Sequence, residues 1–109
     1  MEKDPKIFLD HILKSIEIIE GTIKNKSKEE FFKQRDLQDI CIYRIQIIGE
    51  AAKNISKKFQ QEHKDIPWKE MAGTRDKLIH DYFGVDFEIC WVIIKKELPK
   101  IKKGLKEIL

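Results

Sequence analysis

The sequence is poor in residues that interrupt regular structure, with five glycines and three prolines among 109 residues. It also lacks stretches that alternate apolar and polar residues, as a half-buried strand does. Apolar residues instead recur three and four positions apart along most of the chain. No run of about 18 apolar residues is present, and the opening MEKDPKIFLD lacks the segments of a secretory signal. We therefore expect an all-α, cytoplasmic protein that does not enter a membrane.

Cysteine is also scarce. Cys41 and Cys90 lie far apart, and neither belongs to a CxxC pair or to a cluster with histidine. This spacing suggests neither a zinc site nor a disulfide framework. We expect both residues to be buried free thiols, and the sequence predicts no metal and no cofactor.

The chain has no strong excess of one charge. Its net charge of +3 comes from 19 lysines spread over most of the sequence, a mild bias that favours polyanions such as RNA without identifying one. Apolar residues make up 41% of the chain, which is too many for a disordered tail. The length suits one compact domain, and we expect a single domain over residues 1–109.

Helical spacing predicts a small antiparallel bundle of four to five helices. Asp4 is expected to cap a first helix with Pro5 at its first position. The buried stripe of that helix would consist of Phe8, Ile12, Ile16, Ile19 and Ile23. Ser27 to Glu30 reads as a capping box that opens a short helix, which either stops near Gln34 or runs on into the next segment.

The next segment predicts the longest helix, from Asp36 to about Phe59. Its buried stripe would be Leu37, Cys41, Ile45, Ile48, Ala52, Ile55 and Phe59. Ile42, Tyr43 and Ile47 lie away from that stripe and make the helix more apolar than one buried face requires, so a partner surface is possible here.

Two further helices are predicted near the carboxyl end. Pro67 can begin one that carries Met71, Leu78 and Ile79 inward and ends near Gly84. Asp86 can cap the last helix, whose apolar seam is Phe87, Trp91, Ile94, Leu98, Ile101, Leu105 and Ile108. Pro99 lies inside this helix and should kink it or end its first half, because proline removes a backbone hydrogen bond.

The stretch RDKLIHDYFG brings together Arg75, one of three arginines in the chain, with His80 and Tyr82. A fixed cation, a group that titrates near neutrality and a phenol would together suit phosphate chemistry. Five helical residues turn a side chain by about 140°, so the helix must end near His80, or the site must be shared between chains. Asp76 or Asp81 could orient either group. From the residues alone, a surface ion pair and ordinary core-edge residues remain possible.

The order Arg75-x-x-x-x-His80-x-Tyr82, with the polar Asp76 directly after the arginine, resembles the signature of HEPN-domain proteins. It is most similar to the HepT-like toxin branch. Two longer segments are similar to the same branch, RIQIIGEAAKNIS (residues 44–56) and IPWKEMAGTRDKLIHDYFGVDFEICW (residues 66–91). The likeness covers roughly residues 4–104, and the core motif shows no departure from the family pattern.

The resemblance implies a helical homodimer in which Arg75 and His80 of both subunits share a cleft and cleave RNA without a metal ion. Asp76 would support these two catalytic residues. In HepT-like proteins the phenol that matches Tyr82 accepts AMP from a nucleotidyltransferase that is the antitoxin. The chain is therefore expected to be the endoribonuclease toxin of a toxin-antitoxin pair.

Two other classes of protein remain open at this point. In a non-catalytic nucleotide-binding or regulatory module, Arg75 and His80 would bind phosphate and cut nothing. A plain helical assembly module would use its apolar faces alone. Glu50 could orient the motif across the bundle or be solvated, and His11 and His63 are less favoured helpers.

Overall fold

The computed structural model describes residues 4–78 and 84–109, and most of these residues lie in helices. The all-α class is thus confirmed. The elements follow in the order α1 (Pro5–Ile23), α2 (Lys28–Lys33), α3 (Arg35–Lys53), α4 (Lys57–Glu62), α5 (Trp68–Ala72), α6 (Thr74–Leu78), α7 (Phe87–Val92), the π-helical turn η1 (Ile93–Glu97) and α8 (Leu98–Ile108). None of the helices in these two ranges has the length and apolarity needed to cross a membrane.

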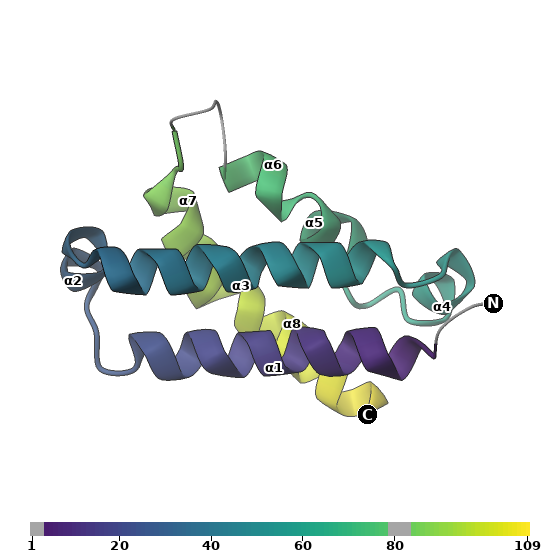
Figure 1. Cartoon of the computed structure of the whole chain (residues 1–109). Coiled ribbons are helices and arrows are strands. Elements are labelled where there is room, and N and C mark those ends of the chain that lie inside the picture. Colours follow the sequence, from purple (N-terminus) through teal and green to yellow (C-terminus); the bar gives the residue numbers. More distant parts are fainter. Residues whose placement is uncertain (1–3, 79–83) are drawn as a thin grey trace.

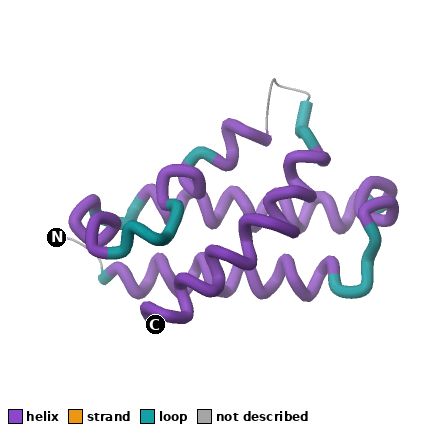
Figure 2. The backbone as a smooth tube through the Cα atoms, turned by 180° about the vertical axis from the view of Figure 1, so that it is seen from behind, coloured by secondary structure: helices purple, strands orange, loops and turns teal. Residues whose placement is uncertain are grey.

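The bundle is built around α1 and α3, which run antiparallel side by side (Figure 1). The chain from α7 through η1 to α8 crosses one face of this pair diagonally (Figure 2). The short helices α5 and α6 lie along α3 on the edge away from α1. Helix α3 therefore contacts both the amino-terminal helix and the segment that carries Arg75.

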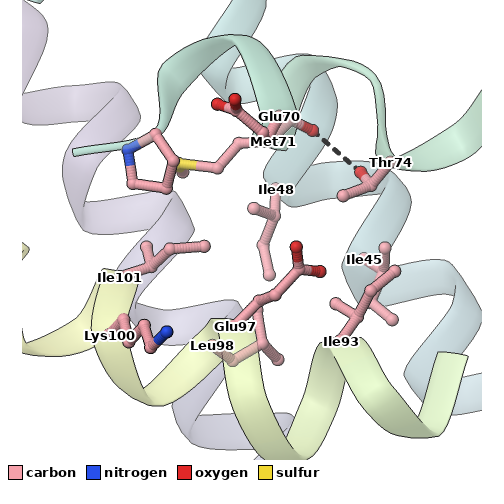
Figure 3. A pocket seen from close by; sticks show the side chains of 11 residues that line it. Ile45, Ile48, Glu70, Met71, Thr74, Ile93, Glu97, Leu98, Lys100 and Ile101 are labelled. Atoms are coloured by element: carbon pink, nitrogen blue, oxygen red, sulfur yellow. Dashed lines mark hydrogen bonds between the residues drawn. The ribbon is translucent and has the colours of Figure 1, made fainter. Parts of the chain in front are cut away.

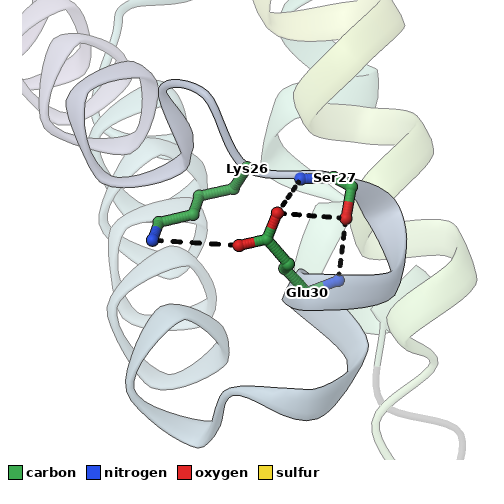
Figure 4. A network of polar contacts seen from close by, with 3 residues as sticks. All are labelled: Lys26, Ser27 and Glu30. Atoms are coloured by element: carbon green, nitrogen blue, oxygen red, sulfur yellow. Dashed lines mark hydrogen bonds and ion pairs between the residues drawn. The ribbon is translucent and has the colours of Figure 1, made fainter.

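The helix starts follow the predicted capping chemistry. The Asp4 side chain accepts a hydrogen bond from the Lys6 backbone N–H at 2.9 Å, and Pro5 opens α1. In the capping box, Ser27 Oγ accepts from the Glu30 N–H at 3.1 Å, while Glu30 Oε1 accepts from the Ser27 N–H at 3.2 Å (Figure 4). The short helix stops at Lys33, which resolves the alternative that the sequence left open.

The core contains most residues of the predicted stripes, whereas Phe87, Trp91 and Ile108 of the last helix are only partly buried and pack against it. In α1 the buried apolar residues are Leu9, Ile12, Ile16, Ile19 and Ile23, and Phe8 packs against them. The last helical segment contributes Cys90, Ile93, Ile94, Leu98, Ile101 and Leu105. Two stripes on antiparallel helices and a third across them enclose one apolar cluster, as burial of one face per helix requires.

The predicted helix from Asp36 to Phe59 is confirmed as far as Lys53 and is wrong beyond it. Helix α3 ends at Lys53, where the Asn54 side chain donates to the Glu50 carbonyl oxygen at 2.9 Å. Ser56 then caps α4, its hydroxyl accepting from the Phe59 N–H at 3.2 Å. Asn and Ser side chains compete with the helix for backbone hydrogen-bonding groups, and this competition ends α3 after Lys53. The apolar residues keep their helical spacing across this break, so the spacing alone predicted one continuous helix.

The outward face of α3 also differs from the expectation. Ile42 is partly buried and packs against the core. Tyr43 is 58% exposed, as predicted, whereas Ile40, which the prediction did not include, is 41% exposed and Ile47 is half-buried. Ile40, Tyr43 and Ile47 are three and four residues apart and therefore form one stripe on the solvent side of α3.

The helix predicted after Pro67 is split in two. Helix α5 ends at Ala72, the Gly73 N–H donates to the Lys69 carbonyl oxygen at 3.0 Å, and α6 begins at Thr74. Met71 and Leu78 are buried as expected. Ile79 and the approach to the predicted end of the helix lie outside the described residues.

The last helix is capped by Asp86 as predicted, with the Ile89 N–H donating to its carboxylate at 3.0 Å. Pro99 does not end it. The backbone instead forms the π turn, in which the Leu98 N–H donates to the Ile93 carbonyl oxygen five residues back. Pro99 has no backbone N–H, so the helix lacks one hydrogen bond at this position in any case. The preceding turn can therefore adopt the wider π geometry without leaving another N–H donor unpaired.

Candidate functional site

The motif residues that the structure describes lie on α6. This helix packs against α3, α5 and α7. Arg75 is its second residue, directly after the buried Thr74, and Asp76 is exposed. His80, Asp81 and Tyr82 lie outside the described residues.

The two flanks of residues 79–83 are held together by a backbone hydrogen bond. The Asp86 N–H donates to the Leu78 carbonyl oxygen at 2.8 Å. Leu78 is buried, and Asp86 caps α7. The end of α6 is therefore fixed both to the core and to the start of the following helix.

A glycine determines how closely α3 approaches α5 and α6. A Cβ atom on Gly49 would lie 3.1 Å from the Met71 carbonyl oxygen and 3.2 Å from Thr74 Oγ1. These two atoms are themselves hydrogen-bonded, with the Thr74 hydroxyl donating to the Met71 carbonyl at 2.8 Å. Gly49 thus sets the position of the residue that precedes Arg75. Sequence reasoning missed this role, although a glycine inside a long helical pattern is a signal for close backbone approach.

An apolar pocket of about 270 Å³ lies beside this contact (Figure 3). Its walls come from α3, α5, η1 and α8, and Figure 3 shows Glu97 reaching from η1 toward α3. A shallower groove of about 620 Å³ separates α6 from the segment α7–η1, with Lys77 on one side and Lys96 on the other. Both hollows border the helix that carries Arg75.

The remaining titratable candidates lie on other elements than α6. Glu50 is exposed, and its carboxylate is 3.5 Å from the Lys53 ammonium, as the solvated alternative predicts. His11 is exposed on α1, and His63 ends α4 with its ring 4.5 Å from that of Phe59. Neither histidine belongs to a helix that packs against α6.

Both cysteines are buried free thiols, as predicted. Burial raises the pKa of Cys41 to about 12, and burial together with the neighbouring Cys41 raises that of Cys90 to about 12. Neither thiol would supply a thiolate nucleophile at neutral pH. Within residues 4–78 and 84–109, no three His, Cys, Asp or Glu side chains gather as a metal site would require.

Comparison with known proteins gives a consistent result. The model of the family described as "Ribonuclease HepT-like" matches residues 12–108. A protein of Methanocaldococcus jannaschii named "Gamma-glutamylcyclotransferase and putative RNase" is 50% identical over the whole chain, which spans only 49% of that relative. A "Putative RNase" of Caldanaerobacter subterraneus subsp. tengcongensis is 47% identical across 98% of this chain and 96% of its own length.

A "Probable ribonuclease HepT" of Thermococcus cleftensis is 42% identical over 99% of this chain and 98% of its own length. No solved structure matches the chain. The chain therefore spans nearly all of two of these three relatives and about half of the first.

Proposed function

The chain belongs to the HepT-like ribonuclease family, a branch of the HEPN-domain proteins, and we propose that it is the metal-independent endoribonuclease toxin of a toxin-antitoxin pair. One observation carries the proposal. The family match over residues 12–108 includes Arg75, His80 and Tyr82 in the order and spacing of the motif. Relatives that align over nearly their whole length are named as ribonucleases.

The proposed reaction transfers an RNA phosphate to its own 2′-oxygen. A base removes the 2′-hydroxyl proton, the 2′-oxygen bonds to phosphorus, and the bond to the 5′-oxygen breaks as an acid protonates that oxygen. His80 would be the base in one subunit and the acid in the other, because an imidazole can both accept and donate a proton. Arg75 would bind the phosphate through two parallel hydrogen bonds and stabilise the charge of the transition state. Asp76, next to it on α6, would support the guanidinium or the imidazole.

This mechanism needs two chains, because each chain contributes one His80. The solvent-facing stripe of Ile40, Tyr43 and Ile47 on α3 supports a homodimer, since exposed apolar side chains that line up on one helix favour burial against a partner. Helix α3 also holds α5 and α6 in place. Association through α3 would therefore involve the helix that supports Arg75.

Inactivation would occur at Tyr82. Its phenol oxygen would attack the α-phosphorus of ATP on a nucleotidyltransferase antitoxin, forming a phosphodiester to AMP and releasing pyrophosphate. The added phosphate would place negative charge and bulk beside Arg75, where the RNA phosphate must bind. Cleavage would stop because the substrate is excluded, with no need for the protein to unfold.

The first test is cleavage of RNA by the purified protein in EDTA. We expect the wild-type chain to cleave, and Arg75→Ala or His80→Ala to lower the rate by about 100-fold or more. Lys77→Ala is the matched control, because Lys77 is an exposed cation on the same helix. Unchanged cleavage by both motif variants would exclude the proposed site.

The second test is intact-mass analysis after coexpression with a nucleotidyltransferase. Each AMP would appear as a discrete mass increment on the wild-type chain and on Tyr43→Phe, and it would be absent from Tyr82→Phe. An increment that persists on Tyr82→Phe would place the modification elsewhere.

A further inference from the structure

A groove on the protein surface, outside α6, is lined by three lysines, and none of them forms an ion pair with a carboxylate of the described residues. It is an open groove of about 440 Å³, formed by α4, the turn after it and the start of α5. Lys57, Lys64 and Lys69 line it and are exposed, and none of them forms an ion pair with another residue in the described part of the chain. Glu70 is the carboxylate among the lining residues, so three positive charges and one negative charge leave the lining at +2.

The groove is supported by a well-packed turn. Trp68 and Ile66 are buried beneath it, and the Trp68 indole N–H donates to the His63 carbonyl oxygen at 2.9 Å. The Phe59 ring meets Trp68 edge-on at 6.1 Å. The backbone that carries Lys64 and Lys69 is therefore fixed before any ligand arrives, which lowers the entropy cost of binding.

We propose that this groove binds the sugar-phosphate backbone of the RNA substrate to one side of the scissile linkage, an inference that rests on the proposed ribonuclease activity. Lysine ammonium groups attract phosphate, and the exposed Gln61 amide on the same lining can donate to phosphate or to 2′-hydroxyl oxygens, whereas the Gln60 amide already donates to the Ile55 carbonyl oxygen at 3.0 Å. Trp68 is only 5% exposed, so its ring is not available for base stacking. The groove would hold the strand without selecting a sequence.

Position along the chain links the groove to the motif. Lys69 and Arg75 are six residues apart, which limits the separation of their Cα atoms to about 22 Å even for a fully extended chain. The helices between them shorten this distance, and α5 and α6 follow one another along α3 (Figure 1). A strand of several nucleotides held at Arg75 would therefore reach the lysines.

The test measures binding of a fluorescent single-stranded RNA by anisotropy in a His80→Ala background, which prevents cleavage during the titration. The triple variant Lys57→Gln, Lys64→Gln, Lys69→Gln should bind about 100-fold more weakly at 0.1 M salt, and its log-log salt slope should fall by about 2, because each phosphate contact contributes about 0.7. Arginine at the same three positions should retain the affinity. Circular dichroism melting checks that each variant is folded.

The control removes the same charge from Lys6, Lys14 and Lys24, which are exposed on α1 and at its end. Its affinity should change less than threefold. Equal affinities of the two glutamine variants would overturn the inference even if the chain is a ribonuclease. Loss of binding confined to the groove variant would support it even if no RNA is cleaved. Competition by polyglutamate as strong as by RNA of equal charge would identify an acidic-protein surface and refute it.

Discussion

Gly49→Ala is expected to destabilise the protein although alanine is the better helix former. The added Cβ would meet the Met71 carbonyl oxygen at 3.1 Å and Thr74 Oγ1 at 3.2 Å. Neither atom can turn aside easily, because one is backbone and the other donates a hydrogen bond to it. Helices α5 and α6 would have to move away from α3 by a few tenths of an ångström.

The size of the effect follows from two opposing contributions. Overpacking a close contact costs about 1–3 kcal/mol, while replacing glycine inside a helix returns about 0.5–1 kcal/mol. The net loss is about 1 kcal/mol. For 109 residues, with an unfolding entropy of about 2.1 cal/mol/K per residue, this corresponds to a fall in Tm of about 4 °C.

Thermal melting by circular dichroism, with Gly21→Ala as the matched control, measures the prediction. Gly21 is exposed on α1, and no described atom lies within 4 Å of a Cβ placed there. Its replacement should therefore raise the Tm by about 2–4 °C through helix propensity alone. RNA cleavage by Gly49→Ala should fall more than its small unfolded fraction explains, because the displaced α6 carries Arg75.

The decisive result is a Tm that falls in Gly49→Ala and rises in Gly21→Ala. A Gly49→Ala variant as stable as the wild type would show that α5 adjusts freely and that the glycine does not set the helix spacing. Lower stability with unchanged cleavage would refute the link between this contact and the position of Arg75.

Three further variants test other parts of the structure. Ser27→Ala removes the capping hydroxyl and should lower the unfolding free energy by about 1 kcal/mol in urea titrations, while an unchanged midpoint would mean that the capping box adds nothing. Because burial raises the pKa values of Cys41 and Cys90 to about 12, the contribution of these protonated thiols to stability is complete below about pH 9 and is lost as the pH rises toward about 12. The free energy of unfolding of the double alanine variant should therefore decline less steeply over that pH range. Tyr43→Glu should convert a dimer to monomers in analytical ultracentrifugation and reduce cleavage, whereas Tyr43→Phe should do neither. A glutamate variant that remains dimeric would move the interface away from this face of α3.

The sequence was informative wherever the physics is local. Apolar spacing of three and four identified the buried face of α1, and the starts of α1, α2 and α7 follow from side chains that reach backbone N–H groups within three residues. It was less reliable where local preferences compete. Apolar residues keep their spacing across Asn54 to Ser56 because Ile55 is buried beside the break, so periodicity alone could not reveal where α3 ends.

By itself, the sequence determined the helical class, the caps, most of the core, and the motif that points to phosphate chemistry. Only the tertiary structure decided that Gly49 places α3 against the turn before Arg75, that Ile40 and not Ile42 faces solvent, and that three lysines line one groove. These features depend on residues brought together from separate helices. Spacing along one segment encodes which side of a helix is apolar, but the distance and rotation between helices arise from the packing of all their side chains at once.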